Sequence, residues 1–129
     1  MVASTTTVQS VFQDAVRSTS THRKNVAALL KLLKRLGPSD FLASLEDCVL
    51  RILAFGKGVA EADRAVTFVG AFLGACRGLD DSGAALARVA SMLLPLSLRG
   101  LSAALKAVRF RSCQILASLL NTVDEITYV

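Results

Sequence analysis

The chain has 129 residues, a length that suits one compact domain or a short run of repeats, and 53% of its residues are hydrophobic. Its longest hydrophobic stretches without a charge, Ala65–Cys76 and Ser112–Val123, hold twelve residues each, whereas a membrane span needs about 20, which favours buried helices over membrane spans. The net charge of +5 is unevenly distributed, with six Lys or Arg and no acid over Val16–Gly37, and five and no acid over Ser82–Val123. This segregation suits a protein with an anionic partner, although basic surface also occurs on proteins that have no such partner.

Hydrophobic residues recur at helical spacing along the chain, and no segment alternates with a period of two residues. Glycine, proline and Ser/Thr clusters mark the breaks between segments. The sequence therefore predicts six helices, over Val8–Arg17, His22–Leu36, Phe41–Phe55, Glu61–Cys76, Ala84–Leu98 and Leu105–Val123.

The predicted helices repeat in pairs. Val26, Val66 and Val108 lie near the starts of the second, fourth and sixth helices and are 40 and 42 residues apart. Two-helix repeats of about 40–47 residues are typical of HEAT and armadillo solenoids. We therefore expect an all-α, HEAT/armadillo-like α-solenoid of about three antiparallel helix pairs, one domain over 1–129 with repeats at 8–37, 39–78 and 82–124.

Residues with catalytic or metal-binding chemistry are few. The only histidine is His22, expected to be exposed, and Gly56-Lys57-Gly58 lacks the frame of a phosphate-binding loop. The three cysteines, Cys48, Cys76 and Cys113, lack CxxC spacing and are interpreted as small buried thiols. Gly70 and Gly74 form a GxxxG pattern that predicts close packing of soluble helices. We expect no enzyme, cofactor or metal site.

The second predicted helix is basic. Arg23 and Lys24 stand near its start, and at 100° per residue Lys24, Lys31 and Arg35 share one side, opposite the leucines. No acid in the same helix pairs with them. This ridge could follow a phosphate backbone, or it could be a solvated face that keeps a hydrophobic helix soluble.

Two arginines of the sixth predicted helix fall on different sides of the helical wheel. Arg109 lies within the arc of Leu116, Leu119 and Leu120, which predicts a buried, structural residue with a carbonyl or carboxylate partner. Arg111 lies toward Ser118 and Gln114, so Arg111 and Lys106 are the candidates for contact with DNA.

Further basic residues are ambiguous. Lys57 is either a contact in a glycine-rich turn or part of a plain connector. Arg64 follows Glu61 by three residues, a spacing at which the two charges can neutralise each other.

Two segments resemble one protein family. Val11–Ala15 followed by Thr21–Val26, and then Ala107–Leu116, resemble the corresponding segments of the CAP-G type HEAT-repeat subunit of condensin, condensin subunit 3. Because members of that family are several times longer, the resemblance predicts an N-terminal fragment of a longer solenoid or a truncated product.

The resemblance implies a non-catalytic subunit that binds double-stranded DNA together with a kleisin partner and works beside SMC ATPases in mitotic chromosome condensation. It implies a location in the nucleus, on chromosomes. With aromatic residues at 5% and no tryptophan, we expect weak sequence preference. Two alternatives remain open: a protein–protein adaptor without DNA contact, and a helix array on a membrane surface.

Overall fold

A computed structural model describes residues 7–36, 38–54, 60–78 and 84–127, and within these ranges it holds six α-helices, one 3-10 helix and no strand. The helices are α1 (Val8–Ala15), η1 (Thr19–Thr21), α2 (His22–Arg35), α3 (Pro38–Ala54), α4 (Ala60–Arg77), α5 (Ala84–Gly100) and α6 (Lys106–Thr127). The predicted all-α fold is confirmed, and the helix ends lie within a few residues of the expected ones.

Local chemistry explains where the first helices begin. Thr7 caps α1, because its side chain accepts from the backbone N–H of Ser10 and the Ser10 side chain accepts from the backbone N–H of Thr7. Helix α3 begins at Pro38, three residues before the predicted start, since proline fits the first turn of a helix without losing a hydrogen bond.

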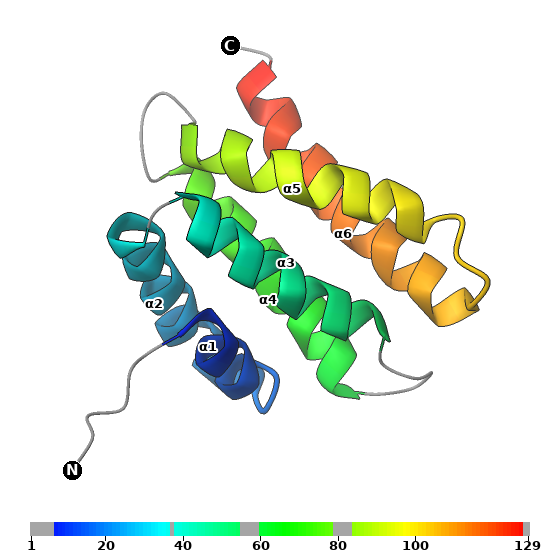
Figure 1. Cartoon of the computed structure of the whole chain (residues 1–129), viewed down its shortest axis with the longest axis horizontal. Coiled ribbons are helices and arrows are strands. Elements are labelled where there is room, and N and C mark those ends of the chain that lie inside the picture. Colours follow the sequence, from blue (N-terminus) through cyan, green and yellow to red (C-terminus); the bar gives the residue numbers. More distant parts are fainter. Residues whose placement is uncertain (1–6, 37, 55–59, 79–83, 128–129) are drawn as a thin grey trace.

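The helices form two layers of three (Figure 1). Figure 1 shows α1, α3 and α5 side by side in the nearer layer and α2, α4 and α6 behind them, with the two members of each pair antiparallel. The pair α3–α4 lies between the pairs α1–α2 and α5–α6. This is an all-α helical-repeat arrangement. The predicted repeat boundaries at 8–37, 39–78 and 82–124 stay a prediction.

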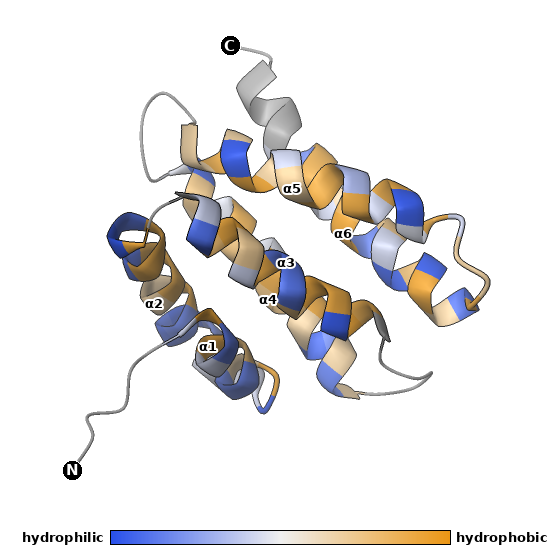
Figure 2. Cartoon of the chain, viewed as in Figure 1, coloured by the Kyte–Doolittle hydropathy of each residue, from blue (hydrophilic) through white to orange (hydrophobic). Residues whose placement is uncertain are grey.

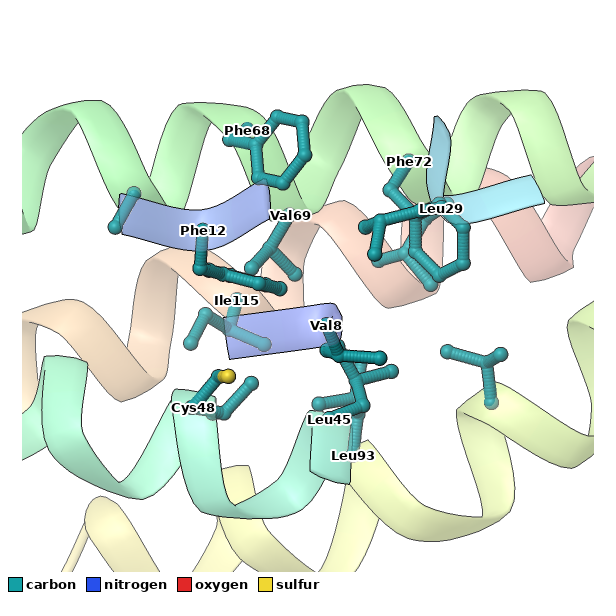
Figure 3. Packing of buried hydrophobic residues seen from close by; sticks show 14 of the residues in the cluster. Val8, Phe12, Leu29, Leu45, Cys48, Phe68, Val69, Phe72, Leu93 and Ile115 are labelled. Atoms are coloured by element: carbon teal, nitrogen blue, oxygen red, sulfur yellow. The ribbon is translucent and has the colours of Figure 1, made fainter. Parts of the chain in front are cut away.

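One hydrophobic core runs between the layers (Figure 3). The rings of Phe12 in α1 and Phe68 in α4 meet edge to face with centroids 5.1 Å apart, and Phe41 in α3 lies 6.0 Å from Phe72 in α4. Leu93 in α5 is also fully buried. Outside this core the surface is hydrophilic on α2, as Figure 2 shows for the turns of α2 that face away from the other helices.

The GxxxG pattern packs through one of its two glycines. A Cβ on Gly70 would lie 3.2 Å from Oγ of Ser118, so α4 and α6 approach closely there. A Cβ on Gly74 would meet no atom within 4 Å. The expected close packing is therefore confirmed at Gly70 and wrong at Gly74.

Candidate nucleic-acid interface

The strongest cluster of positive charge lies on α2. Lys24, Lys31 and Arg35 line a single surface cavity of about 440 Å³, whose floor is made by Ala27, Ala28 and Leu32. We call these six residues the α2 basic hollow. All three cations are exposed, so the shared face predicted by the helical wheel is confirmed. The hollow combines a hydrophobic floor with a cationic rim, which suits a phosphate or another anion.

The other basic residues predicted as contacts do not join this hollow. Arg23 is exposed on a neighbouring side of α2. Lys106 is exposed at the first position of α6, on the far side of the α3–α4 pair from α2 (Figure 1). Lys57 lies outside the described residues. Thus the predicted contacts form one group on α2 and a separate residue on α6.

One acid that the sequence did not predict as part of this site, Asp14, stands at the edge of the α2 basic hollow. Asp14, in the last turn of α1, lies with Oδ2 3.3 Å from Nζ of Lys24 and accepts a 2.9 Å hydrogen bond from Nδ2 of Asn25. These two contacts, with that of Asn25 the larger, lower the pKa of the Asp14 carboxyl below its usual value of 3.8. Lys24 is therefore paired, although no acid of its own helix is available.

The two arginines of α6 occupy the reverse of their predicted positions. Arg111 is 3% exposed, and its Nη1 donates to the backbone oxygen of Ile52 in α3 at 3.3 Å. Arg109 is exposed and donates to the carbonyls of Ala103 (2.7 Å) and Ala104 (2.9 Å) in the connection before α6. The predicted outward position of Arg111 and buried position of Arg109 are both wrong.

The error has a physical cause. Helix α6 carries more hydrophobic residues than the core accepts, and Leu120, used to orient the wheel, is 58% exposed. The buried stripe of α6 is instead formed by Arg111, Ser112, Ile115 and Leu119. Burial of Arg111 is possible because the carbonyl of Ile52 accepts from its guanidinium.

Arg64 makes a similar hydrogen bond between helix pairs, one pair earlier in the chain. Its Nε donates to the carbonyl of Val16, the C-cap residue of α1, and its Nη2 lies 3.9 Å from Oε1 of Glu61. The predicted pairing with Glu61 is confirmed. Arg64 and Arg111 thus both reach from an even-numbered helix to a carbonyl at the end of an odd-numbered helix in the preceding pair.

His22 and one cysteine also differ from expectation. His22 is 8% exposed rather than on the surface, since its Nε2 lies 3.0 Å from the carbonyl oxygen of Ala15 and its ring packs against Phe68. Cys48 and Cys76 are buried as predicted, whereas Cys113 is exposed. Burial, and next the charge of Asp47, raises the pKa of the Cys48 thiol to about 11, so this thiol stays protonated at neutral pH.

A second cavity opens between α1 and α3. It measures about 410 Å³, and it is lined by Gln9, Phe12, Gln13, Val16, Cys48, Arg51 and Ile52. Its walls are mostly hydrophobic and its rim carries amide groups. Arg51 at this rim is 3.3 Å from Asp47 and so is already paired. The cavity has the size and lining of a pocket for a hydrophobic side chain.

The described residues hold neither a cluster of metal ligands nor a membrane-spanning helix. Across 7–36, 38–54, 60–78 and 84–127, no three His, Cys, Asp or Glu residues lie close enough to hold a metal ion. Among the helices of these same ranges, none combines the length and the hydrophobicity required to cross a bilayer.

Comparison with known proteins places the chain near a subunit of condensin. The chain is similar to condensin complex subunit 3. The match is to the protein of Schizosaccharomyces pombe, with 32% identity over 111 residues, and it covers 83% of this chain and 12% of that protein. No protein-family model matches the sequence. The chain spans about an eighth of the relative's length.

Proposed function

We propose that this chain is a non-catalytic HEAT-repeat scaffold module of a condensin complex, and that it contacts the phosphate backbone of double-stranded DNA through α2. The observation that carries the proposal is the α2 basic hollow, where Lys31 and Arg35 border one cavity in a helix without an acid. The similarity to condensin complex subunit 3 independently supports the proposed role in a condensin complex.

The proposed contact is electrostatic and independent of base sequence. Arg23, Lys31 and Arg35 would meet successive phosphates, with Lys24 at the edge of the same surface and Lys106 as a separate contact on α6. Each phosphate neutralised releases counterions, so affinity should fall steeply as salt rises. Arg111 is excluded from the contact set because its side chain is buried.

The biological context also belongs to the proposal. In a condensin, a kleisin subunit would share the DNA contact, SMC ATPases would act indirectly, and the site of action would be chromosomes in the nucleus of dividing cells. The named relative supports this context, while the DNA contact itself rests on the charges of α2.

A charge reversal tests the DNA contact. Lys31→Glu should weaken binding of a labelled duplex about five- to tenfold at about 50 mM salt, and it should lower the slope of log affinity against log salt by about one. Arg88→Glu is the matched control, because Arg88 is an exposed cation on α5 away from the hollow. Fluorescence anisotropy over a salt series measures both, with duplexes of two unrelated sequences.

Two results would contradict the proposal. One is an unmodified chain that does not bind duplex DNA even at low salt. The other is an equal loss for Lys31→Glu and Arg88→Glu, which would mean that total charge, rather than the α2 surface, governs binding.

The second candidate function is a protein–protein adaptor that makes no contact with DNA. The observation that favours it is the hydrophobic cavity of about 410 Å³ between α1 and α3. There a partner peptide would insert a hydrophobic side chain beside Phe12 and Ile52. Absence of DNA binding together with a partner contact that Gln13→Glu removes would favour this function, since Gln13 lines the cavity and is exposed.

A further inference from the structure

Asp14 is held in place beside the cations of α2. Its carboxylate accepts from Asn25, whose side chain is 4% exposed, and this contact fixes the carboxylate against the start of α2. From there Oδ2 reaches Nζ of Lys24 at 3.3 Å, although the Lys24 side chain is 73% exposed. An exposed lysine pays conformational entropy to stay in one place, and a fixed partner lowers that cost.

Lys24, Arg64 and Arg111 are cations of the even-numbered helices, and each contacts a residue at or near the end of an odd-numbered helix. In α2, α4 and α6 the cation is followed directly by a buried residue, and a second buried residue lies seven positions further on. These pairs are Asn25 and Leu32, Ala65 and Phe72, and Ser112 and Leu119.

The contacts of these three cations differ. Arg64 and Arg111 donate to backbone carbonyls, of Val16 and Ile52 respectively, and Arg64 also lies 3.9 Å from the carboxylate of Glu61. Lys24 meets a full carboxylate, and that carboxylate also stands at the border of the α2 basic hollow. A negative charge at this border repels an incoming phosphate while it neutralises the nearest lysine.

We propose that Asp14 is a built-in anionic competitor for the DNA backbone, which withholds Lys24 of the α2 basic hollow from phosphate. This inference rests on the proposed DNA contact and concerns its regulation. DNA affinity is then set below the value that the cations of α2 could reach. Any change that removes the Asp14 charge extends the phosphate-binding surface to Lys24.

The test compares three versions of the 129-residue chain: unmodified, Asp14→Asn and Asp47→Asn. Asp14→Asn removes the charge but keeps an oxygen that can accept from Asn25. Asp47→Asn is a matched control because Asp47 is 3.3 Å from Arg51, also exposed, and on α3 rather than at the hollow. Circular dichroism checks that all three have equal helix content.

The expected result is a gain of one phosphate contact. At about 50 mM salt, Asp14→Asn should bind a labelled duplex about three- to tenfold more tightly, with a salt slope steeper by about 0.9. Asp47→Asn should stay within about twofold of the unmodified chain, because exposed charges beyond a Debye length are screened. A second substitution, Lys24→Gln, should remove most of the gain in the Asp14→Asn chain.

Lys24→Gln in the otherwise unmodified chain gives an independent check that needs no change at Asp14. It should weaken DNA binding less than Lys31→Gln does, since Asp14 already occupies the Lys24 amine. An equal loss for the two substitutions overturns the inference.

The outcomes separate this inference from the proposed function. If the unmodified chain binds DNA and Asp14→Asn matches Asp47→Asn, the competitor role is wrong and the DNA contact stands. If only Asp14→Asn binds, the competitor role holds and the DNA function of the unmodified chain falls. If none of the chains binds at low salt, both are overturned.

Discussion

Two arginines set specific contacts between neighbouring helix pairs. Arg64 and Arg111 each cross from one pair to the preceding one and end on a backbone oxygen, of Val16 and Ile52. A carbonyl near a helix end lacks one of its ordinary partners, so a guanidinium there satisfies an acceptor that would otherwise be left without one. Such ties favour one register between stacked helices in a way that hydrophobic contact alone does not.

The two arginines of α6 should therefore differ in their effect on stability. Arg111→Ala should lower the free energy of unfolding by about 2–3 kcal/mol, because it strands the buried Ile52 carbonyl and opens a cavity. Arg109→Ala should cost about 1 kcal/mol or less, since its partners lie in an exposed connection. Urea unfolding followed by circular dichroism measures both changes. The helical wheel predicts the opposite order, and observing that order would contradict the structure.

The candidate site was only partly predictable from sequence. The shared face of Lys24, Lys31 and Arg35 follows from helix periodicity within one element, and periodicity is a local property. Asp14 reaches Lys24 from another helix, and a pairing across helices depends on how α1 lies against α2. The one available signal was that Asp14 is the only acid before Asp40 and stands ten residues ahead of Lys24.

At the scale of the element, helix positions were predictable because Ser, Thr, Gly and Pro residues mark the breaks between helices in the sequence. Ser/Thr residues precede α1 and α2, and Pro38 opens α3. The rotation of α6 about its own axis was not predictable, since Leu116 and Leu120 suggested a stripe that the core does not use. Where a helix has a surplus of hydrophobic residues, tertiary packing decides which of them are buried.

The crossing of α5 and α6 depends on a glycine. A Cβ on Gly100 would lie 1.8 Å from Oγ and 2.7 Å from Cβ of Ser112, which is fully buried, so the helices must move apart to admit it. Gly100→Ala should lower the free energy of unfolding by about 2 kcal/mol or more. Gly74→Ala, inside α4 with open space around its Cβ, should instead raise it by about 0.5–1 kcal/mol. Thermal unfolding of the two variants gives the sign.

Ser112 provides the control for this prediction. Its Oγ is buried and has no hydrogen-bond partner among the described residues, so Ser112→Ala should cost little stability by itself. In the Gly100→Ala chain, Ser112→Gly should restore part of the loss because it removes both clashing atoms. No recovery would mean that Gly100 acts through backbone freedom and not through close approach.

At the scale of the whole molecule, the two ends of the helix stack differ in surface chemistry. The α1–α2 end presents the cations of α2, whereas the α5–α6 end exposes leucines around a cavity of about 220 Å³. Leu94 is 41% and Leu120 58% exposed at this cavity. In helical repeats a polar outer face keeps a terminal pair soluble, and a hydrophobic outer face is one that another surface can cover.

This asymmetry predicts concentration-dependent self-association of the 129-residue chain through the α5–α6 end. Leu94→Gln with Leu120→Gln should reduce the weight-average mass in sedimentation experiments while changing the free energy of unfolding by about 0.5 kcal/mol or less per site. Leu50→Gln is the matched control, since Leu50 is 46% exposed on α3 and does not line this cavity. Like charges on the α2 surface repel one another at low salt, so association should also increase with salt, the reverse of the trend expected for DNA binding. If Leu50→Gln lowers the mass and the double variant does not, the contact lies on α3 and the α5–α6 end is not the adhesive surface.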